Sequence, residues 1–193
     1  MKNKLLIIGA GIYALVANEI ANDIGCFDKI DFIDDNAKLT PNGIAVIGTT
    51  TDIAELSKDY ENCIVAIGNP DVRLLLMEKI EKETNCNIIS LISPRAYIAP
   101  SAKIEKGCVV EPMTVIHTMC RIGIGCFISA GAVVNHASVI GDGCHIDCNA
   151  TVLGNQNVPA KTKICSGEVF CEKHLPTTPV PVNEKVYRFD DVM

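Results

Sequence analysis

An aliphatic residue recurs at every sixth position of this chain, without a break, through most of its second half. The series consists of Ile98, Ile104, Val110, Ile116, Ile122, Ile128, Val134, Ile140, Ile146, Val152, Val158 and Ile164. An amphipathic helix needs an apolar residue every three to four positions, so one in six does not form its apolar stripe. A period of six suits short extended segments that repeat along the chain. The stretch from 98 to 169 is therefore predicted to be a solenoid of the hexapeptide β-helix type.

The position four residues after each aliphatic residue is mostly small, as in Ala102, Cys108, Thr114, Cys120, Cys126, Ala132, Ser138, Cys144 and Ala150. Both positions are even offsets, so their side chains share one face of the extended chain. Three hexads make one turn of a triangular coil, and the series predicts about four turns stacked about 4.8 Å apart. The cysteines of this set are expected to be core residues rather than metal or redox groups.

Apolar runs alternate with amphipathic segments in the first half of the chain. Strands are expected at about 4–8, 29–33, 43–48, 63–67 and 87–92, and helices at about 13–24, 52–60 and 71–83. This alternation predicts a small Rossmann-like, doubly wound α/β domain. The expected organisation is an α/β domain over 1–94, the β-helix over 95–170, and a tail over 171–193 whose prolines cannot continue a strand ladder.

A glycine pair, Gly9 and Gly11, follows the first predicted strand and lets the backbone approach a phosphate at a helix N-terminus. Asp34 and Asp35 end the second strand, where a carboxylate would meet a ribose hydroxyl. Ala14 occupies the place of the third fingerprint glycine, so a tight turn in an ordinary α/β domain is the competing interpretation. A nicotinamide dehydrogenase is not expected, because no second α/β half follows.

Two histidines occupy defined places in the repeat. His136 lies near a corner of the coil, where its side chain should point outward, and Gly154 lies directly above it on the next turn. A glycine there leaves room for a thin ligand. His145 is half a turn away, so one subunit does not easily bring both imidazoles to one ligand. The hypothesis is that a neighbouring chain in a threefold ring does so, with His136 from one chain and His145 from the next. A surface or structural role is the alternative for a lone outward histidine.

Composition limits the location and the partners. The 193 residues carry a net charge of −6 without a basic tract, so nucleic acid is not an expected partner. The ten cysteines fall mostly in strand-like apolar runs rather than in a disulfide framework. Neither a signal peptide nor a membrane helix is recognisable, so a cytoplasmic protein with no membrane partner is expected.

Four segments together resemble the hexapeptide-repeat acyltransferases, in particular the sugar O- and N-acetyltransferases of the sialic-acid and bacillosamine (PglD-like) type. They are residues 7–11, 32–35, 65–73 and 135–145. The resemblance implies a Rossmann-like domain joined to a left-handed parallel β-helix, and a homotrimer with interfacial active sites. It also implies acetyl-CoA as co-substrate, with no metal.

The resemblance also implies roles for single residues. His136 matches the general base that deprotonates a sugar amine or hydroxyl, while His145 and Gly154 match positions of the acetyl-CoA site. The implied pocket for a nucleotide-linked sugar comprises Gly9, Gly11, Tyr13, Asp34, Asp35, Gly68 and Asn69. The chain differs from the family in having Tyr13 in place of a histidine, Ala137 in place of an acidic residue, and a shorter coil.

The predicted function is therefore acetyl-CoA-dependent acetylation of the amine or hydroxyl of a nucleotide-linked or free sugar. Two alternatives stay open. The chain is a degenerate, non-catalytic trimeric solenoid that acts as a scaffold or binds a ligand, or it is a transferase with a different acyl donor. Affinity for CoA and the effect of His136→Ala on turnover separate these hypotheses.

Overall fold

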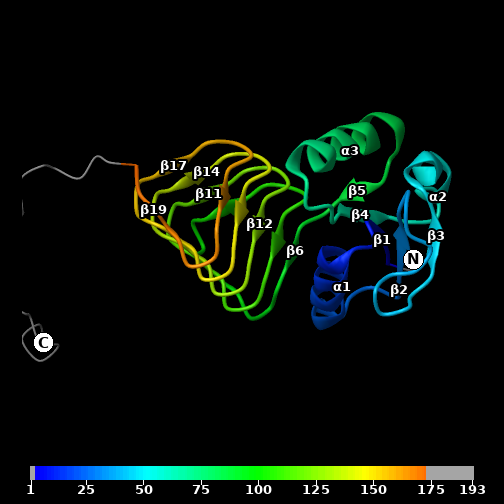
Figure 1. Ribbon diagram of the computed structural model, residues 1–193, viewed down its shortest axis with the longest axis horizontal. Coiled ribbons are helices and arrows are strands. Elements are labelled where there is room, and N and C mark those ends of the chain that lie inside the picture. Colours follow the sequence, from blue (N-terminus) through cyan, green and yellow to red (C-terminus); the bar gives the residue numbers. More distant parts are fainter. Residues whose placement is uncertain (1–2, 173–193) are drawn as a thin grey trace, which may run out of the picture.

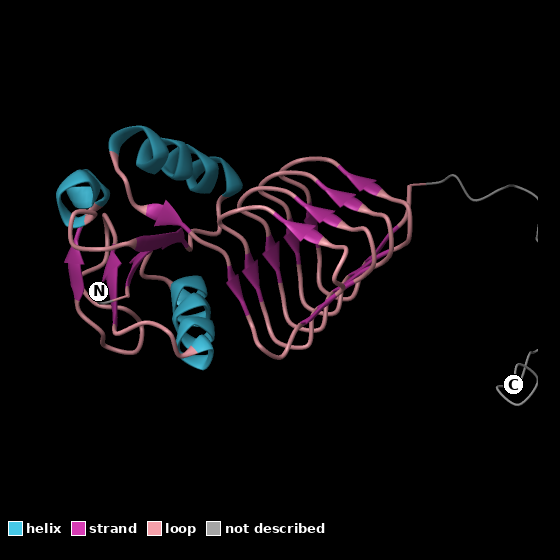
Figure 2. Ribbon diagram, turned by 180° about the vertical axis from the view of Figure 1, so that it is seen from behind, coloured by secondary structure: helices cyan, strands magenta, loops and turns pink. Residues whose placement is uncertain are grey.

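The computed structural model describes residues 3–172 (Figure 1). Almost all of the predicted tail, residues 173–193, lies outside the described residues. Within 3–172 the chain forms a small α/β sheet with its helices and, next to it, a coil of stacked strands with a triangular outline (Figure 2).

The N-terminal sheet is parallel and has the strand order β3-β2-β1-β4-β5. Its strands are β1 (Lys4–Ile8), β2 (Lys29–Ile33), β3 (Val46–Gly48), β4 (Asn62–Val65) and β5 (Asn87–Ile88). Its helices are α1 (Ile12–Ile24), the 3-10 turn η1 (Thr50–Asp52), α2 (Ile53–Leu56) and α3 (Pro70–Glu83). The order reverses between β1 and β4, so the loops after these two strands meet at the place where open α/β sheets bind ligands. The predicted helices and the first four predicted strands are present, although α2 and β3 are shorter than expected.

The coil contains fourteen two-residue strands, arranged in three parallel sheets. Face 1 consists of β7 (Tyr97–Ile98), β10 (Val115–Ile116), β13 (Val133–Val134), β16 (Thr151–Val152) and β19 (Val169–Phe170). Face 2 consists of β8 (Lys103–Ile104), β11 (Arg121–Ile122), β14 (Val139–Ile140) and β17 (Asn157–Val158). Face 3 consists of β6 (Leu91–Ile92), β9 (Val109–Val110), β12 (Phe127–Ile128), β15 (His145–Ile146) and β18 (Lys163–Ile164).

The coil is one strand longer at each end than the aliphatic series predicts. The prediction of one strand over 87–92 is wrong. This segment forms two short strands, of which Asn87–Ile88 joins the α/β sheet and Leu91–Ile92 pairs with β9. Ile92 extends the six-residue series backward by one unit. Phe170 extends it forward, since an aromatic ring fills the same position at the last turn.

The small positions of the repeat are buried as predicted, except for Ala102, which is partly buried, and several of them also donate hydrogen bonds. Cys108, Cys120, Cys126 and Cys144 are all fully buried. The Cys120 thiol lies 3.0 Å from the Asn135 carbonyl, fifteen residues ahead, and Cys108, Cys126 and Cys144 make the equivalent contact at 3.0–3.1 Å. A thiol at this position therefore fills the corner and satisfies a buried carbonyl.

Every sixth residue from 107 to 167 adopts the left-handed conformation, with φ between 55° and 73°. The series is Gly107, Met113, Met119, Gly125, Gly131, Ala137, Gly143, Asn149, Asn155, Lys161 and Gly167. Glycine and asparagine tolerate this conformation, whereas other side chains cost about 1–2 kcal/mol each. The coil therefore carries local strain at Met113, Met119, Ala137 and Lys161.

The α/β domain and the coil share one core. On face 3 the outward side chains of Leu91, Val109 and Phe127 are fully buried, because they pack in the same cluster as Leu5 of β1 and Ala14 of α1. Face 3 beyond these three strands carries His145 and Lys163 instead. The first three strands of face 3 thus form one wall of the α/β domain, which fixes the two parts relative to each other.

A buried arginine locks this junction. Arg73 of α3 is 0% exposed, and its guanidinium lies 3.9 Å from the ring centroid of Phe127. It donates hydrogen bonds of 2.7–3.0 Å to the carbonyls of Ile67, Gly68, Gly125 and Gly143. Two of these carbonyls belong to the loop after β4 and two to corners of the coil, so one side chain ties this loop of the α/β domain to the solenoid.

Candidate active site

His136 follows β13 at the corner between faces 1 and 2, and its side chain is exposed, as the repeat predicts. Its imidazole lies against Gly154 on the next turn. A Cβ built on Gly154 would be 2.6 Å from Cε1 and 2.7 Å from Nε2 of His136. The space above the histidine, expected to admit a thin ligand, therefore holds the imidazole itself.

An open hollow of about 470 Å³ lies beside this ring. Its lining is His136, Leu153, Gly154, Asn155, Gln156, Cys171 and Glu172. His117, one turn below, has its ring centroid 6.4 Å from that of His136, with the rings at 73°. The sequence analysis did not single out His117 or Glu172, although both lie close to whole-turn spacings from His136.

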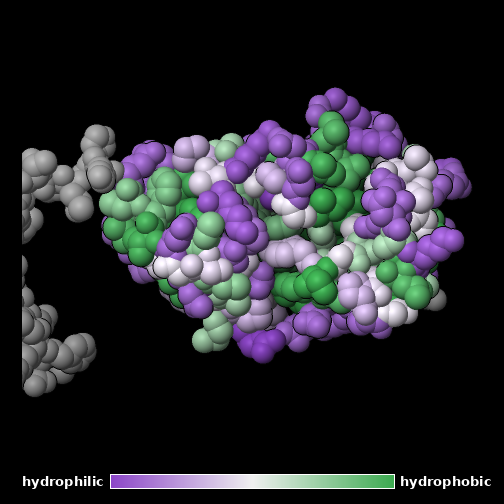
Figure 3. Space-filling model, viewed as in Figure 1, coloured by the Kyte–Doolittle hydropathy of each residue, from purple (hydrophilic) through white to green (hydrophobic). Residues whose placement is uncertain are grey.

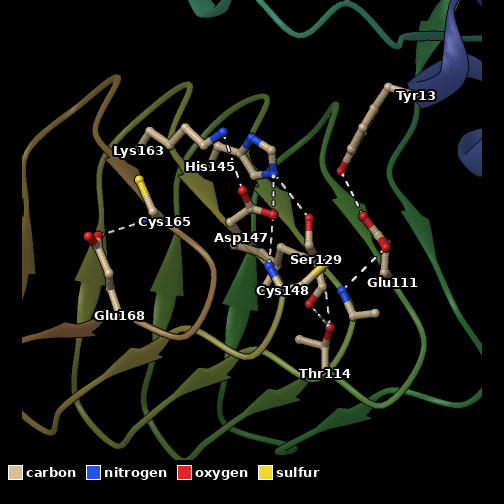
Figure 4. A network of polar contacts seen from close by, with 12 residues as sticks. Tyr13, Glu111, Thr114, Ser129, His145, Asp147, Cys148, Lys163, Cys165 and Glu168 are labelled. Atoms are coloured by element: carbon tan, nitrogen blue, oxygen red, sulfur yellow. Dashed lines mark hydrogen bonds and ion pairs between the residues drawn. The ribbon is translucent and has the colours of Figure 1, made fainter.

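His145 lies on face 3, away from His136, in a second polar cluster (Figure 4). Its Nε2 is 3.1 Å from the Ser129 hydroxyl and 3.9 Å from an Asp147 carboxylate oxygen. Burial lowers the pKa of His145, and the positive charges of Lys163 and Arg73 lower it further. The negative charge of Asp147 raises it, but by less than the burial lowers it. The ring is therefore neutral at pH 7. Because Ser129 and Asp147 face the same ring nitrogen, they do not form the relay of a serine hydrolase.

Tyr13 connects this cluster to the glycine loop. Its ring stacks on Phe127 with centroids 4.0 Å apart, and its hydroxyl donates to Glu111 Oε1 at 3.2 Å (Figure 4). Burial, reinforced by the Glu111 charge, raises the pKa of Tyr13, so the phenol stays protonated. The side chain predicted to touch substrate thus lies at the junction between α1 and the coil.

Three polar side chains of this cluster were missed by sequence reasoning. Glu111, Ser129 and Asp147 are spaced by eighteen residues, one full turn, and they stack along the edge between faces 3 and 1. Glu111 Oε2 also accepts from the Ala130 amide at 3.3 Å. The eighteen-residue spacing of polar residues is the signal that would have found them.

The glycine loop and the two aspartates are brought together, but the carboxylates already have backbone partners. Asp34 accepts from the Ala10 amide at 2.9 Å and from the amides of Asn36 and Ala37 at 2.8 and 3.0 Å. Asp35 accepts from the Thr50 amide and hydroxyl at 2.7 and 2.9 Å. Asp34 thereby occupies a loop amide that a phosphate would otherwise use. Gly9 has φ of 115°, and an added Cβ would lie 3.0 Å from the Ala66 carbonyl oxygen.

Gly11 and Asn69 cap the two helices that begin at this edge. Gly11 is the N-cap of α1, and the Asn69 side chain accepts from the amides of Asp71 and Val72 at 2.9 and 3.2 Å. The Gly68 carbonyl is one of the Arg73 acceptors. The Asn69 side chain is therefore the N-cap of α3, and its carbonyl oxygen is already hydrogen-bonded to the first turn of that helix.

A cavity of about 300 Å³ lies at the same edge, lined by Gly9, Asp34, Asp35, Asn36, Thr50, Ile67, Val72, Leu75 and Leu76. Hydrophobic residues are exposed over α3 (Figure 3), where Val72 and Leu75 are 41% and 65% exposed. The lining contains no lysine or arginine, so its chemistry suits a base and a ribose better than a diphosphate.

Among residues 3–172, no group of three or more His, Cys, Asp or Glu side chains is placed to hold a metal ion. Over the same residues, no helix is both long enough and apolar enough to cross a membrane.

Comparison with known proteins shows what the chain is similar to. Residues 4–80 match the family model of the PglD N-terminal domain. The acetyltransferase domain of PglB from Neisseria gonorrhoeae FA1090, solved in complex with acetyl coenzyme A, is 27% identical with a TM-score of 0.79. That match covers 89% of this chain and 92% of the Neisseria domain. No curated protein sequence matches the chain.

Two further solved structures share the fold. WeeI from Acinetobacter baumannii AYE is 23% identical with a TM-score of 0.79, covering 89% of this chain and 82% of WeeI. PerB from Caulobacter crescentus, in complex with CoA and GDP-perosamine, is 22% identical with a TM-score of 0.75, covering 88% and 89%. The predicted fold, a Rossmann-like domain followed by a left-handed parallel β-helix, is confirmed. The predicted resemblance to hexapeptide-repeat sugar acetyltransferases is confirmed by these matches, and so is the predicted enzyme class, an acyltransferase.

Proposed function

We propose that this protein transfers the acetyl group of acetyl-CoA to an amine or hydroxyl of a nucleotide-linked sugar, with His136 as general base. The observation that carries the proposal is the exposed imidazole of His136, seated on Gly154 beside an open hollow. It occurs in a chain similar over 89% of its length to an acetyltransferase domain in complex with acetyl coenzyme A.

The chemistry needs no covalent enzyme intermediate. The sugar nitrogen or oxygen forms a bond to the thioester carbonyl carbon, and the proton that it loses passes to the His136 imidazole. The C–S bond then breaks, and the CoA thiolate takes that proton and leaves as the thiol. Binding both substrates in one site supplies proximity, and a backbone N–H near the carbonyl stabilises the oxyanion.

The site is completed between subunits. His136 and His145 lie at different places around the coil, separated by face 1. A neighbouring copy in a threefold ring brings His145 of one chain to His136 of the next. The neutral state of His145 suits it to donate a hydrogen bond to the donor thioester or to CoA.

The composition of face 1 supports this assembly. Its outward side chains are Tyr97, Val115, Val133, Thr151 and Val169, none of them charged. Tyr97 and Val169 are 57% and 62% exposed. Face 2 presents Lys103, Arg121, Val139 and Asn157 instead, and the α/β domain covers the first three strands of face 3. Face 1 is thus the apolar surface best suited to contact a second copy.

The acceptor enters from the α/β domain. The cavity between Gly9, Asp34, Asp35 and α3 holds the base and ribose, and the sugar extends toward the coil. PerB, which shares the fold, is described with GDP-perosamine and CoA, and this supports a nucleotide-linked acceptor here. The cytoplasm is the proposed location, with no nucleic acid or membrane partner.

Isothermal titration with acetyl-CoA is the first test, followed by mass spectrometry of mixtures with UDP-, GDP- and CMP-linked amino sugars. We expect binding in the range of about 1 μM to 1 mM and an acetylated product. His136→Ala should lower turnover by about 10²–10⁴-fold, whereas Asn157→Ala, an exposed change on face 2, should leave it unchanged. Full activity in His136→Ala contradicts the mechanism. A folded trimer that binds no CoA points to a scaffold or to another acyl donor.

A further inference from the structure

Glu172 occupies the same column of the coil as His136. His136, Gly154 and Glu172 are spaced by eighteen residues, one turn each. The register supports this directly, since Val134, Val152 and Phe170, each two residues earlier, are paired in sequence along face 1. The three residues therefore lie above one another at the corner between faces 1 and 2.

Gly154 has no side chain to separate His136 from Glu172, the two outer members of this column. Neighbouring turns are about 4.8 Å apart, so side chains two turns apart would ordinarily be separated by a third. Here the His136 ring fills the place of that third side chain. The imidazole consequently lies about one turn below the backbone of Glu172, within reach of a flexible glutamate, and both residues line the same hollow.

Gln156 fixes the backbone of Glu172 at this place. The Glu172 amide donates to Gln156 Oε1 at 2.6 Å, and Gln156 Nε2 donates to the Gly154 carbonyl at 3.1 Å. One side chain thus ties the last described residue of the coil to the glycine that supports the His136 ring.

The charges around the ring favour a pairing with Glu172. Of the residues that line the hollow, Glu172 is the one acid, and none is lysine or arginine. Among residues 3–172, the other titratable groups placed next to the ring or in the hollow are His117, one turn below, and the Cys171 thiol. A general base becomes a cation when it takes its proton, and a nearby carboxylate stabilises that cation.

We infer that Glu172 is a positioning residue for His136, and that its carboxylate pairs across Gly154 with the imidazolium formed during acetyl transfer. The inference rests on the proposed function, in which His136 is the base. Glu172 itself takes no proton in the reaction. It orients the ring and stabilises its charged state.

Steady-state kinetics between pH 5.5 and 9 test the pairing in Glu172→Gln and Glu172→Asp, with Glu105→Gln, an exposed glutamate elsewhere on the coil, as the control. We expect Glu172→Gln to lower kcat about fivefold, the size of an exposed charge pair, with KM within about twofold. The acidic limb of the kcat profile should move to lower pH. Glu172→Asp should retain most of the activity, because it keeps the carboxylate. A Glu172→Gln profile that superimposes on the wild type overturns the inference, as does equal damage by Asp and Gln.

A readout without turnover separates this inference from the proposed function. The ring C–H resonances of His136, assigned by their loss in His136→Gln, should show a step from ionisation of the Glu172 carboxylate at acidic pH, besides the step of the ring itself. The step should vanish in Glu172→Gln. Identical titrations in both proteins refute the pairing. If the step is present but no acceptor is acetylated, the pairing stands and the proposed function fails.

Discussion

The imidazole of His136 occupies the volume that any side chain at Gly154 would fill, since an added Cβ would lie 2.6 Å from Cε1 of the ring. A residue on one turn of the coil thereby sets the orientation of a side chain on the turn before it. The relationship makes Gly154 a support for the histidine as well as part of the lining of the hollow.

Gly154→Ala should displace the His136 ring and lower kcat by about 10²-fold, because misplacement of a reacting group by about 1 Å costs that much. The melting temperature should change little, since the ring is exposed and free to rotate away. Ser166→Ala, an exposed change at the same place in the repeat, is the control for both measurements. Unchanged kcat in Gly154→Ala would show that the ring orientation is unimportant.

Arg73→Met should destabilise the fold by about 3–5 kcal/mol in urea unfolding, because it leaves four carbonyls without their donor in a buried junction. Arg95→Met is the matched control. Arg95 pairs with Asp23 at the surface, so its loss should cost less than about 1 kcal/mol. Similar losses for the two variants would show that Arg73 does not lock the junction.

Two exchanges at the left-handed corners should change stability in opposite directions. Met119→Gly relieves a strained φ of 60° at a residue that is 65% exposed, and should stabilise the fold by about 1 kcal/mol. Gly167→Ala introduces a Cβ that meets no atom within 4 Å, but at φ of 72°, and should cost about 1 kcal/mol. Urea midpoints of the two variants measure both effects, and a shift of the same sign in both would contradict the strain argument.

Stability should fall as the pH drops below about 6.5, because burial lowers the pKa of His145 in the folded protein. The unfolded chain takes up a proton near pH 6.5, whereas the folded chain does so only at lower pH. The contribution is therefore fully present above pH 6.5 and declines below it. Urea midpoints at pH 7.5 and 5.5 measure the decline, which His145→Gln should reduce. An equal decline in His145→Gln would assign the effect to other groups.

Val133→Lys should convert the proposed trimer to monomers, because it places a charge in the middle of face 1. Val139→Lys, six residues on, makes the same exchange at an outward position of face 2 and should leave the assembly intact. Sedimentation velocity distinguishes the two. Loss of assembly in Val139→Lys alone would place the interface on face 2.

Much of the fold is readable from the sequence because the coil is built from local units. Each hexad repeats the same burial pattern, so the aliphatic series from Ile98 to Ile164 predicts its strands one by one. The ends are less well predicted. Leu91 is apolar enough for either sheet, and only its pairing with Val109 assigns it to the coil.

The outward position of His136 and its relation to Gly154 also follow from counting residues, because the turn length is constant. Contacts between the α/β domain and the coil do not follow from counting. The sequence places Tyr13 after a glycine loop and Arg73 on an ordinary helix, with no sign that both flank Phe127.

Periodicity along the chain thus determined the solenoid, its core and the column that carries His136. The tertiary structure alone decided that Asp34 and Asp35 bind backbone amides and that Arg73 is buried against the coil. The physical reason is that a repeat fixes neighbours at constant spacing. A contact between two different kinds of structure depends on how their surfaces pack, and no single segment of the chain encodes it.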